Sequence, residues 1–247
     1  MSKKFAKLAG AISTLTLALV MVPATAFAAN SVVPSQFQTD KATIKGSIDL
    51  SNTTTRSGQE VTRDGQLYYD GTIGGTVEAS DLFEGAYDKY VADFKGKVEP
   101  FTKNHYENLV MYSKEETFPV AEFTIDLPDN AIIDASEIVA TENTATISKI
   151  TTDVDQTAKK VTFTLYLGNW NDYKEFFQLY EKEKGTTGHA ISINVPYSIA
   201  ITNPAQTSLG TITADGKCEL YKYGGLFLRK AKIVNVTANQ LIYSIDR

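Results

Sequence analysis

Hydrophobic and polar residues alternate along much of this chain with the period of two that is typical of β-strands. In the run from Ala42 to Leu50, apolar or small side chains occupy every second position. Seven further segments are rich in Val, Ile, Thr, Tyr and Phe, which favour strands. They span 109–112, 118–127, 144–151, 161–167, 189–201, 209–223 and 231–245. Many short strands without regular alternation with helices predict a mostly β fold, an antiparallel β-sandwich of immunoglobulin-like or jelly-roll-like type.

Glycine and polar residues indicate where these strands end. The stretch from Ser51 to Gly65 is rich in Thr, Ser, Asn and Gly, and we expect a loop or an exposed hairpin there. The following strand contains two turn or bulge signals, Asp70-Gly71 and Gly74-Gly75. Ala214 to Gly216 is predicted to form the turn of a hairpin.

Two segments change to the helical period and place aromatic side chains on one face. Ser80 is expected to cap the first helix and Gly96 to end it. Asn169 or Asn171 is expected to cap the second, which ends before Gly185. The two aromatic faces comprise Phe83, Tyr87, Tyr90 and Phe94, and Tyr173, Phe176, Phe177 and Tyr180. We therefore predict two short, aromatic-faced helices in the connections between strands.

The first 28 residues have the features of an export signal. Three lysines precede an uncharged apolar run from Leu8 to Val22, and Ala26-Phe27-Ala28 matches the pattern cut by signal peptidase. We expect residues 1–28 to be a signal peptide that is removed. Of the 247 residues, 219 would then remain, enough for one large sandwich or two small domains.

The mature chain is expected to divide into two parts. Residues 29–40 are predicted to be a flexible N-terminal segment, and 41–247 a β-sandwich domain. Two small subdomains with a boundary near 100–115 are the alternative for this domain.

The mature chain is acidic, which restricts its partners. Three of the 24 basic residues leave with the signal peptide, so against 29 acidic residues the net charge is −8. Nucleic acids and anionic membranes require basic patches, so we expect neither as the main partner. No anchoring segment, lipid-attachment cysteine or sortase signal is recognised, so we expect no membrane insertion after signal cleavage. The predicted location is extracellular, either secreted or held at the cell surface by non-covalent contacts.

The reactive residues do not form a known catalytic motif. The chain has no Gly-x-Ser-x-Gly, His-Glu-x-x-His or phosphate-loop sequence. Its one cysteine, Cys218, excludes an internal disulfide, and an exported protein without one fits a Gram-positive bacterium. We expect Cys218 to be a buried thiol. Glu122 has the most apolar sequence neighbours among the acids and is expected to face outward from a strand. We therefore predict that the protein is not an enzyme.

Aromatic residues with a polar edge are the main candidates for binding. Tyr68, Tyr69, Trp170 and Tyr173 are of the kind that protein-binding and sugar-binding surfaces use. Tyr68 and Tyr69 are adjacent in a predicted strand, so they must face opposite sides. The alternative is that these rings pack at the edge of the core, with their hydroxyl groups hydrogen-bonded.

No cofactor is expected, with calcium as the one ion considered. Asp126, Asp129 and Asp134 lie close together around one predicted turn and could supply oxygen ligands. Their spacing does not follow the EF-hand pattern. Acids that stabilise a β-turn through local hydrogen bonds are the alternative explanation.

These observations lead to three hypotheses about function. The first is an exported, non-catalytic, adhesin-like module that binds a host or cell-envelope protein or glycan. The second is a structural subunit of an extracellular matrix, surface layer or fibre, whose polar 30–40 segment could add a strand to another copy. The third is a secreted hydrolase with two catalytic carboxylates. Over 41–245 the composition is similar to that of modules of Gram-positive surface proteins, without a family motif.

Overall fold

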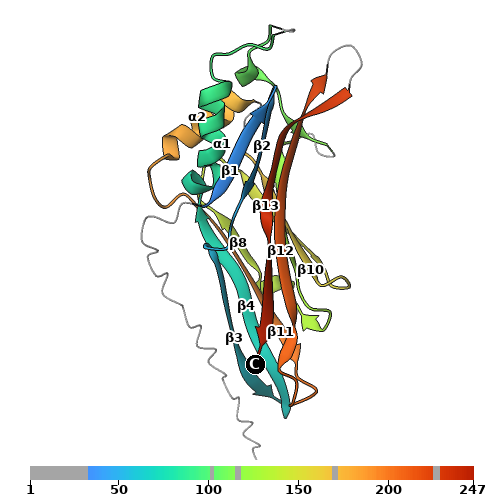
Figure 1. The fold of residues 1–247 in the computed structure, drawn as a ribbon. Coiled ribbons are helices and arrows are strands. Elements are labelled where there is room, and N and C mark those ends of the chain that lie inside the picture. Colours follow the sequence, from blue (N-terminus) through green and yellow to red (C-terminus); the bar gives the residue numbers. More distant parts are fainter. Residues whose placement is uncertain (1–32, 101–102, 115–117, 169–171, 225–228) are drawn as a thin grey trace, which may run out of the picture. The chain divides into compact units, whose positions relative to one another are not determined.

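The computed structural model of this chain describes residues 33–100, 103–114, 118–168, 172–224 and 229–247. Two β-sheets make up most of this part (Figure 1). The larger has the strand order β1-β2-β13-β12-β6-β10-β9, and a short β5 also pairs with β12. Its strands are β1 (Ser35–Asp40), β2 (Thr43–Ile48), β5 (Tyr112–Ser113), β6 (Val120–Asp126), β9 (Lys149–Asp155), β10 (Lys160–Tyr166), β12 (Ser208–Gly224) and β13 (Arg229–Asp246).

The smaller sheet has the order β3-β4-β11-β7, and β8 also pairs with β11. Its strands are β3 (Thr54–Arg63), β4 (Gln66–Glu78), β7 (Ala131–Ile132), β8 (Val139–Glu142) and β11 (Ala190–Ala200). Among the described strands, β2 and β13 form the one parallel pair. The predicted mostly β, antiparallel sandwich is therefore confirmed in its main features.

The predicted alternation positions the core between the two sheets. In β10, Val161, Phe163 and Leu165 are buried while the residues between them are partly exposed. Ile73 of β4 and Ile199 of β11 supply the facing side of the same apolar cluster. One face of each strand therefore provides the core, as the period of two requires.

Helices α1 (Ala79–Asp93) and α2 (Tyr173–Glu183) pack against each other, and α1 also contacts β1 (Figure 1). Two 3-10 turns, η1 (Tyr106–Asn108) and η2 (Ala135–Glu137), lie in connections. The two predicted aromatic faces meet, with the Tyr90 and Phe177 rings stacked at 4.6 Å between centroids. Asp172 caps α2 by accepting a hydrogen bond from the Glu175 amide; the predicted Asn169 and Asn171 lie outside the described residues.

The start of α1 differs from the prediction. Ser80 lies inside the helix, and Glu78 is the residue at the cap position. The Glu78 carboxylate does not cap the helix, because it accepts hydrogen bonds from the amides of Gly188 and His189 at 3.2 and 3.0 Å. Gly96 follows the helix with a φ of 70°, in agreement with its predicted role as a stop.

The predicted flexible segment 29–40 is wrong from Ser35 onward, where β1 begins. Phe37 packs against the core, and Gly85 of α1 leaves room for its ring. The Thr39 hydroxyl donates a hydrogen bond to Asp93 of α1 at 2.7 Å. These contacts with a helix more than forty residues away hold the segment in place, and a local pattern cannot show them.

The alternative of two subdomains is also wrong. Strand β13 pairs with β2 in the larger sheet, and β4 pairs with β11 in the smaller, so each sheet combines strands from both sides of the proposed 100–115 boundary. The described residues from Val33 to Arg247 belong to one compact unit.

The glycines predicted to mark turns or bulges in β4, and the one predicted to mark a turn in β12, lie within continuous strands. Strand β4 runs through Gly71 and Gly74, and β12 runs through Gly216 with a bulge between Ala214 and Gly216. A side chain on Gly71 would overlap the ring of Tyr197 on β11. An aromatic ring that covers a glycine on the next strand is a known way to stabilise such positions. These glycines therefore permit close packing, and the predicted hairpin turn at 214–216 does not exist.

Candidate functional site

The inner faces of the two sheets leave an apolar cavity of about 210 Å³ between them. Strands from both sheets and helix α1 line it, among them Ile73 and Val77 of β4, Val234 of β13 and Phe83 of α1. The wall also contains a set of small residues, which leave the space unfilled. They include Ala121 of β6, Ala214, Gly216 and Cys218 of β12, and Ala238 of β13.

The charged side chains in the wall of this cavity face away from it. Glu122 is the one acid in its lining among the described residues, and it pairs with Lys217 at 2.9 Å. Their side chains are 40% and 64% exposed, in agreement with the outward position expected for Glu122. Burial raises the pKa of the Cys218 thiol to about 12, so the thiol is protonated at neutral pH. In the described part of the chain, the cavity therefore offers no pair of facing carboxylates for a glycosidase mechanism.

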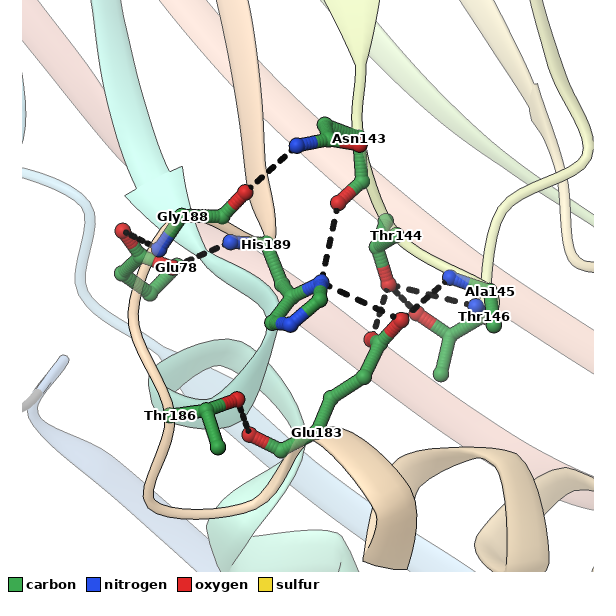
Figure 2. Close-up of polar contacts among 9 residues, drawn as sticks. All are labelled: Glu78, Asn143, Thr144, Ala145, Thr146, Glu183, Thr186, Gly188 and His189. Atoms are coloured by element: carbon green, nitrogen blue, oxygen red, sulfur yellow. Dashed lines mark hydrogen bonds and ion pairs between the residues drawn. The ribbon is translucent and has the colours of Figure 1, made fainter.

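A second polar site lies at the end of α2, where the Glu183 side chain is only 7% exposed (Figure 2). Its two carboxylate oxygens accept hydrogen bonds from the Thr144 hydroxyl and the Ala145 amide, both at 2.5 Å. The Thr144 hydroxyl also lies 2.7 Å from that of Thr146, which is fully buried. A carboxylate inside the fold is thus satisfied by groups from the β8–β9 connection.

His189 lies at the edge of the same site, with its side chain 35% exposed. Its Nδ1 is 3.4 Å from Glu183 and 3.3 Å from the carbonyl oxygen of Asn143 (Figure 2). The Asn143 side chain donates to the Gly188 carbonyl at 2.7 Å, and Glu78 accepts from the Gly188 amide. The site therefore connects the α2–β11 loop with the β8–β9 connection and with the start of α1.

The chemistry of the Glu183 site is that of a structural connection. A carboxylate beside an imidazole could orient a general base, which would need a hydroxyl or thiol on the other ring nitrogen. The Thr144 hydroxyl donates its hydrogen bond to Glu183. The contacts of the His189 ring among the described residues are made by Nδ1, and no hydroxyl or thiol is hydrogen-bonded to Nε2. Sequence analysis missed this site, because Glu183 occurs in the run 181–184 of alternating Glu and Lys, which is typical of an exposed helix end.

Of the predicted aromatic binding residues, the three that the structure describes do not lie together on one surface. Tyr68 and Tyr69 face opposite sides, with the Arg63 guanidinium 4.3 Å from the Tyr68 ring centre and the Tyr69 ring over Gly58. Tyr173 is 1% exposed, and its hydroxyl donates to the Ile233 carbonyl at 2.6 Å. Its ring is therefore not exposed on the outer surface and contributes instead to the lining of the cavity. Trp170 lies outside the described residues.

Two of the three predicted metal ligands have separate protein partners. Asp126 pairs with Lys160 at 3.2 Å, and Asp134 accepts hydrogen bonds from Ser136 at the start of η2. Asp129 is exposed in the turn after β6. In the described ranges, no group of three or more His, Cys, Asp or Glu side chains could hold a metal ion.

The open edge of the smaller sheet is formed by β3, which pairs with β4 alone. The two strands are joined by a two-residue turn, Asp64-Gly65, with φ values of 51° and 80°, which corresponds to the predicted exposed hairpin. In such a hairpin the closing pair, here Arg63 and Gln66, is hydrogen-bonded and the pairs then alternate. The backbone groups that point away from β4 therefore belong to Arg56, Gly58, Glu60 and Thr62.

Comparisons with known proteins give only distant likenesses. No protein-family model and no curated protein matches this chain. The major pilin subunit BcpA of Bacillus cereus is 10% identical over 76% of this chain and 39% of its own, with a TM-score of 0.27. Domains D2 and D3 of the major pilin SpaD from Corynebacterium diphtheriae are 11% identical over 76% and 51%, with a TM-score of 0.27.

Delta-toxin of Clostridium perfringens is 5% identical over 87% of this chain and 93% of its own, with a TM-score of 0.25. This chain thus spans about half or less of the pilin structures that it matches. At these scores the interpretation of the sites depends on the geometry of the chain itself. Within the described ranges, none of the helices has the length and apolar character needed to span a membrane.

Proposed function

We propose that this protein is a structural subunit that assembles outside the cell by pairing its edge strand β3 with a strand of another copy. The observation that carries the proposal is the open edge of β3. This strand is ten residues long, pairs with β4 alone, and is exposed at all but two positions. The signal peptide expected in residues 1–28 would direct the protein to an extracellular location.

An unpaired strand edge attracts another strand, because half of its backbone amides and carbonyls have no partner in the sheet. In β3 these groups recur at Arg56, Gly58, Glu60 and Thr62. Natural monomers protect such an edge with charged side chains, a proline, a bulge or a covering segment. The charged residues of β3 are Arg56, Glu60 and Arg63, and each is engaged within the same copy, with Ser244, Arg247 and Asp70 respectively. Strand β3 contains no proline and is paired in continuous register with β4, without a bulge.

The edge is also held in place before any partner arrives. The Ser57 hydroxyl lies 2.7 Å from that of Thr72, and Arg63 pairs with Asp70 at 2.8 Å, both across the β3–β4 ladder. Glu60 pairs with Arg247 at 2.6 Å, which ties β3 to the end of β13. A strand that is already ordered loses little conformational entropy on pairing, which favours association.

The test is a proline that removes one outward amide and leaves the β4 ladder unchanged. Thr62 is exposed and its amide points away from β4, so Thr62→Pro removes a donor only from the open edge. Thr62→Val is the matched control, because it keeps the amide and a β-branched side chain of the same size. Both variants of the mature chain should be compared with wild type by sedimentation velocity from micromolar to millimolar concentration, and by electron microscopy.

We expect wild type and Thr62→Val to form larger species as the concentration rises, and Thr62→Pro to require at least tenfold higher concentration. Circular dichroism would verify that the three proteins have the same fold. Wild-type protein that stays monomeric throughout this range would contradict the proposal. Equal assembly by Thr62→Pro and Thr62→Val would show that another surface is responsible.

A further inference from the structure

We propose that the cavity between the two sheets is a binding site for a linear alkyl chain. The inference does not depend on assembly through β3, because the cavity lies inside one copy. Three properties of the cavity support it: its size, its extension along the strands, and the chemistry of its lining.

The size of the cavity exceeds what a well-packed core leaves empty. Protein interiors contain few voids larger than a water molecule, and an engineered apolar cavity of about 150 Å³ already binds benzene or xenon. The cavity here is about 210 Å³. Water is a poor occupant, because it needs two to four polar partners and most of the inward-facing wall is hydrocarbon.

The extension of the cavity favours a chain over a compact ring. Its lining continues from Ile73 to Val77 along β4 and from Val234 to Ala238 along β13. Each stretch covers four residue steps, which correspond to about 13 Å at the usual rise of a strand. A space of this length and modest volume is narrow, and a linear alkyl chain has the matching form.

The lining also excludes charged ligands from the interior. Glu122 and Lys217 are the charged residues in the wall of the described part, and they face outward and pair with each other at 2.9 Å. A buried charge without a partner would be strongly unfavourable. Apolar side chains such as Phe83 and Val234 line the cavity and are only partly buried. An alkyl chain would complete their contacts.

The cavity has an origin in the sequence. At inward positions of β6, β12 and β13, where Val, Ile or Leu would be usual, the chain has Ala121, Cys218 and Ala238. Empty cavities destabilise a protein in proportion to their volume, so an occupant that restores contact is favoured. A single larger side chain at Ala121 would occupy the space that the ligand needs.

The experiment measures the binding of 1-butanol, 1-hexanol and 1-octanol to the mature chain by titration calorimetry. Each added CH2 group should raise the affinity about fourfold, as burial of a methylene in an apolar site does, until the chain reaches the end of the cavity. Methyl NMR spectra should show shifts at Ile73 and Val234, which line the cavity, and not at Ile242, which is 64% exposed.

Variants separate a specific site from general solvent effects. Ala121→Leu fills the cavity and should weaken 1-octanol binding at least tenfold. Thr124→Leu is the matched control, because position 124 is on the opposite face of the same strand. Ala86→Leu on α1 is a second filling variant if Ala121→Leu does not fold. Affinity that is independent of chain length, or equal in the filled variants and the control, would overturn the proposal.

Discussion

Removal of the buried carboxylate of Glu183 tests whether the site in Figure 2 is a structural connection. In Glu183→Ala, the Thr144 hydroxyl and the Ala145 amide lose the acceptor that each reaches at 2.5 Å. Each hydrogen bond to a charged acceptor contributes about 1.5–3 kcal/mol. Ala145 is exposed, so in the variant a water molecule can accept the hydrogen bond of its amide. The free energy lost with this hydrogen bond is therefore near or below the lower end of that range. We expect a loss of about 2–4 kcal/mol in the free energy of unfolding.

Glu183→Gln separates the hydrogen bonds from the charge. The amide oxygen can still accept from Ala145, and the amide NH2 can donate to the Thr144 hydroxyl, which can rotate to accept it. We therefore expect a loss of only about 1 kcal/mol in the glutamine variant. Glu181→Ala is a surface control on the same helix. The Glu181 side chain is 38% exposed, and its partners, Lys95 and the Tyr87 hydroxyl, are at the surface, where such a pair contributes about 0–1 kcal/mol.

The assay is equilibrium unfolding in urea at neutral pH. With a slope of about 2 kcal/mol/M, Glu183→Ala should lower the midpoint by about 1–2 M and Glu183→Gln by about 0.5 M. Unchanged slopes would show that the variants expose the same surface on unfolding, so that a shift in the midpoint reports a change in stability. A midpoint for Glu183→Ala within about 0.25 M of wild type would refute the reasoning, since it would mean that the two donors gain nothing from the carboxylate.

Three further predictions concern other parts of the molecule. Gly71→Ala should lower the free energy of unfolding by about 1–3 kcal/mol, because the new methyl overlaps the Tyr197 ring; Gly71→Ala in a Tyr197→Leu background should lose less, and equal losses in urea unfolding would contradict this. Cys218 is partly buried and its pKa is raised to about 12, so it should react with Ellman's reagent at pH 7.5 much more slowly in the native protein than in urea, and equally rapid reaction of the native protein would contradict the raised pKa. The Tyr87 hydroxyl donates to the Glu181 carboxylate and lowers its pKa. The stability that the Glu181 carboxylate contributes is therefore present above about pH 4.3 and is lost as the pH falls through the pKa of Glu181 in the folded protein. An NMR titration of Tyr87→Phe should show this pKa higher than in wild type, and an unchanged value would exclude the hydroxyl as the cause.

Local periodicity predicted many of the elements, because it depends on residues that are neighbours in the sequence. The strand expected at 144–151 begins only at Lys149, and of the strand expected at 109–112 only Tyr112 belongs to a strand. Alternation in β10 and the helical spacing of aromatic residues in α1 and α2 both appear in the structure as predicted. The turns predicted from glycines were wrong because the role of these glycines depends on residues far away in the sequence. The side chain that covers Gly71 belongs to Tyr197, more than 120 positions later, so a close approach could not be distinguished from a turn.

Helix α2 was predicted correctly, but the prediction that its Tyr173 forms part of an exposed binding surface was not confirmed. The spacing placed Tyr173 on the aromatic face of the helix, where it lies in the structure. That face meets α1, and the Tyr173 hydroxyl reaches the Ile233 carbonyl, so the ring is used for packing. Aromatic residues at helical spacing are expected both on a helix that packs against another and on one that binds a ligand. Only the position of α1 in the fold distinguishes the two cases.

Glu183 could not be found from its neighbours at all. The run from Glu181 to Lys184 alternates in charge, and three of these four side chains behave as the pattern suggests, remaining partly or fully exposed. Glu183 is the exception, because donors at Thr144 and Ala145, almost forty residues earlier, replace the water that it loses. A buried charge therefore needs a tertiary partner to be recognised.

Strand β3 relates the fold to the proposed assembly. A strand of ten residues that is exposed at all but two positions buries little apolar surface, so side-chain packing contributes little to its stability. It is held by the β4 ladder, the Asp64-Gly65 turn and polar pairs such as Arg63 with Asp70. These contacts fix the register of β3 and leave its outer backbone groups without a partner in the sheet. In a monomer, each further residue of such an edge strand adds no hydrogen bond on its outer side. Pairing with a strand of another copy would satisfy the outward amides and carbonyls along the whole strand.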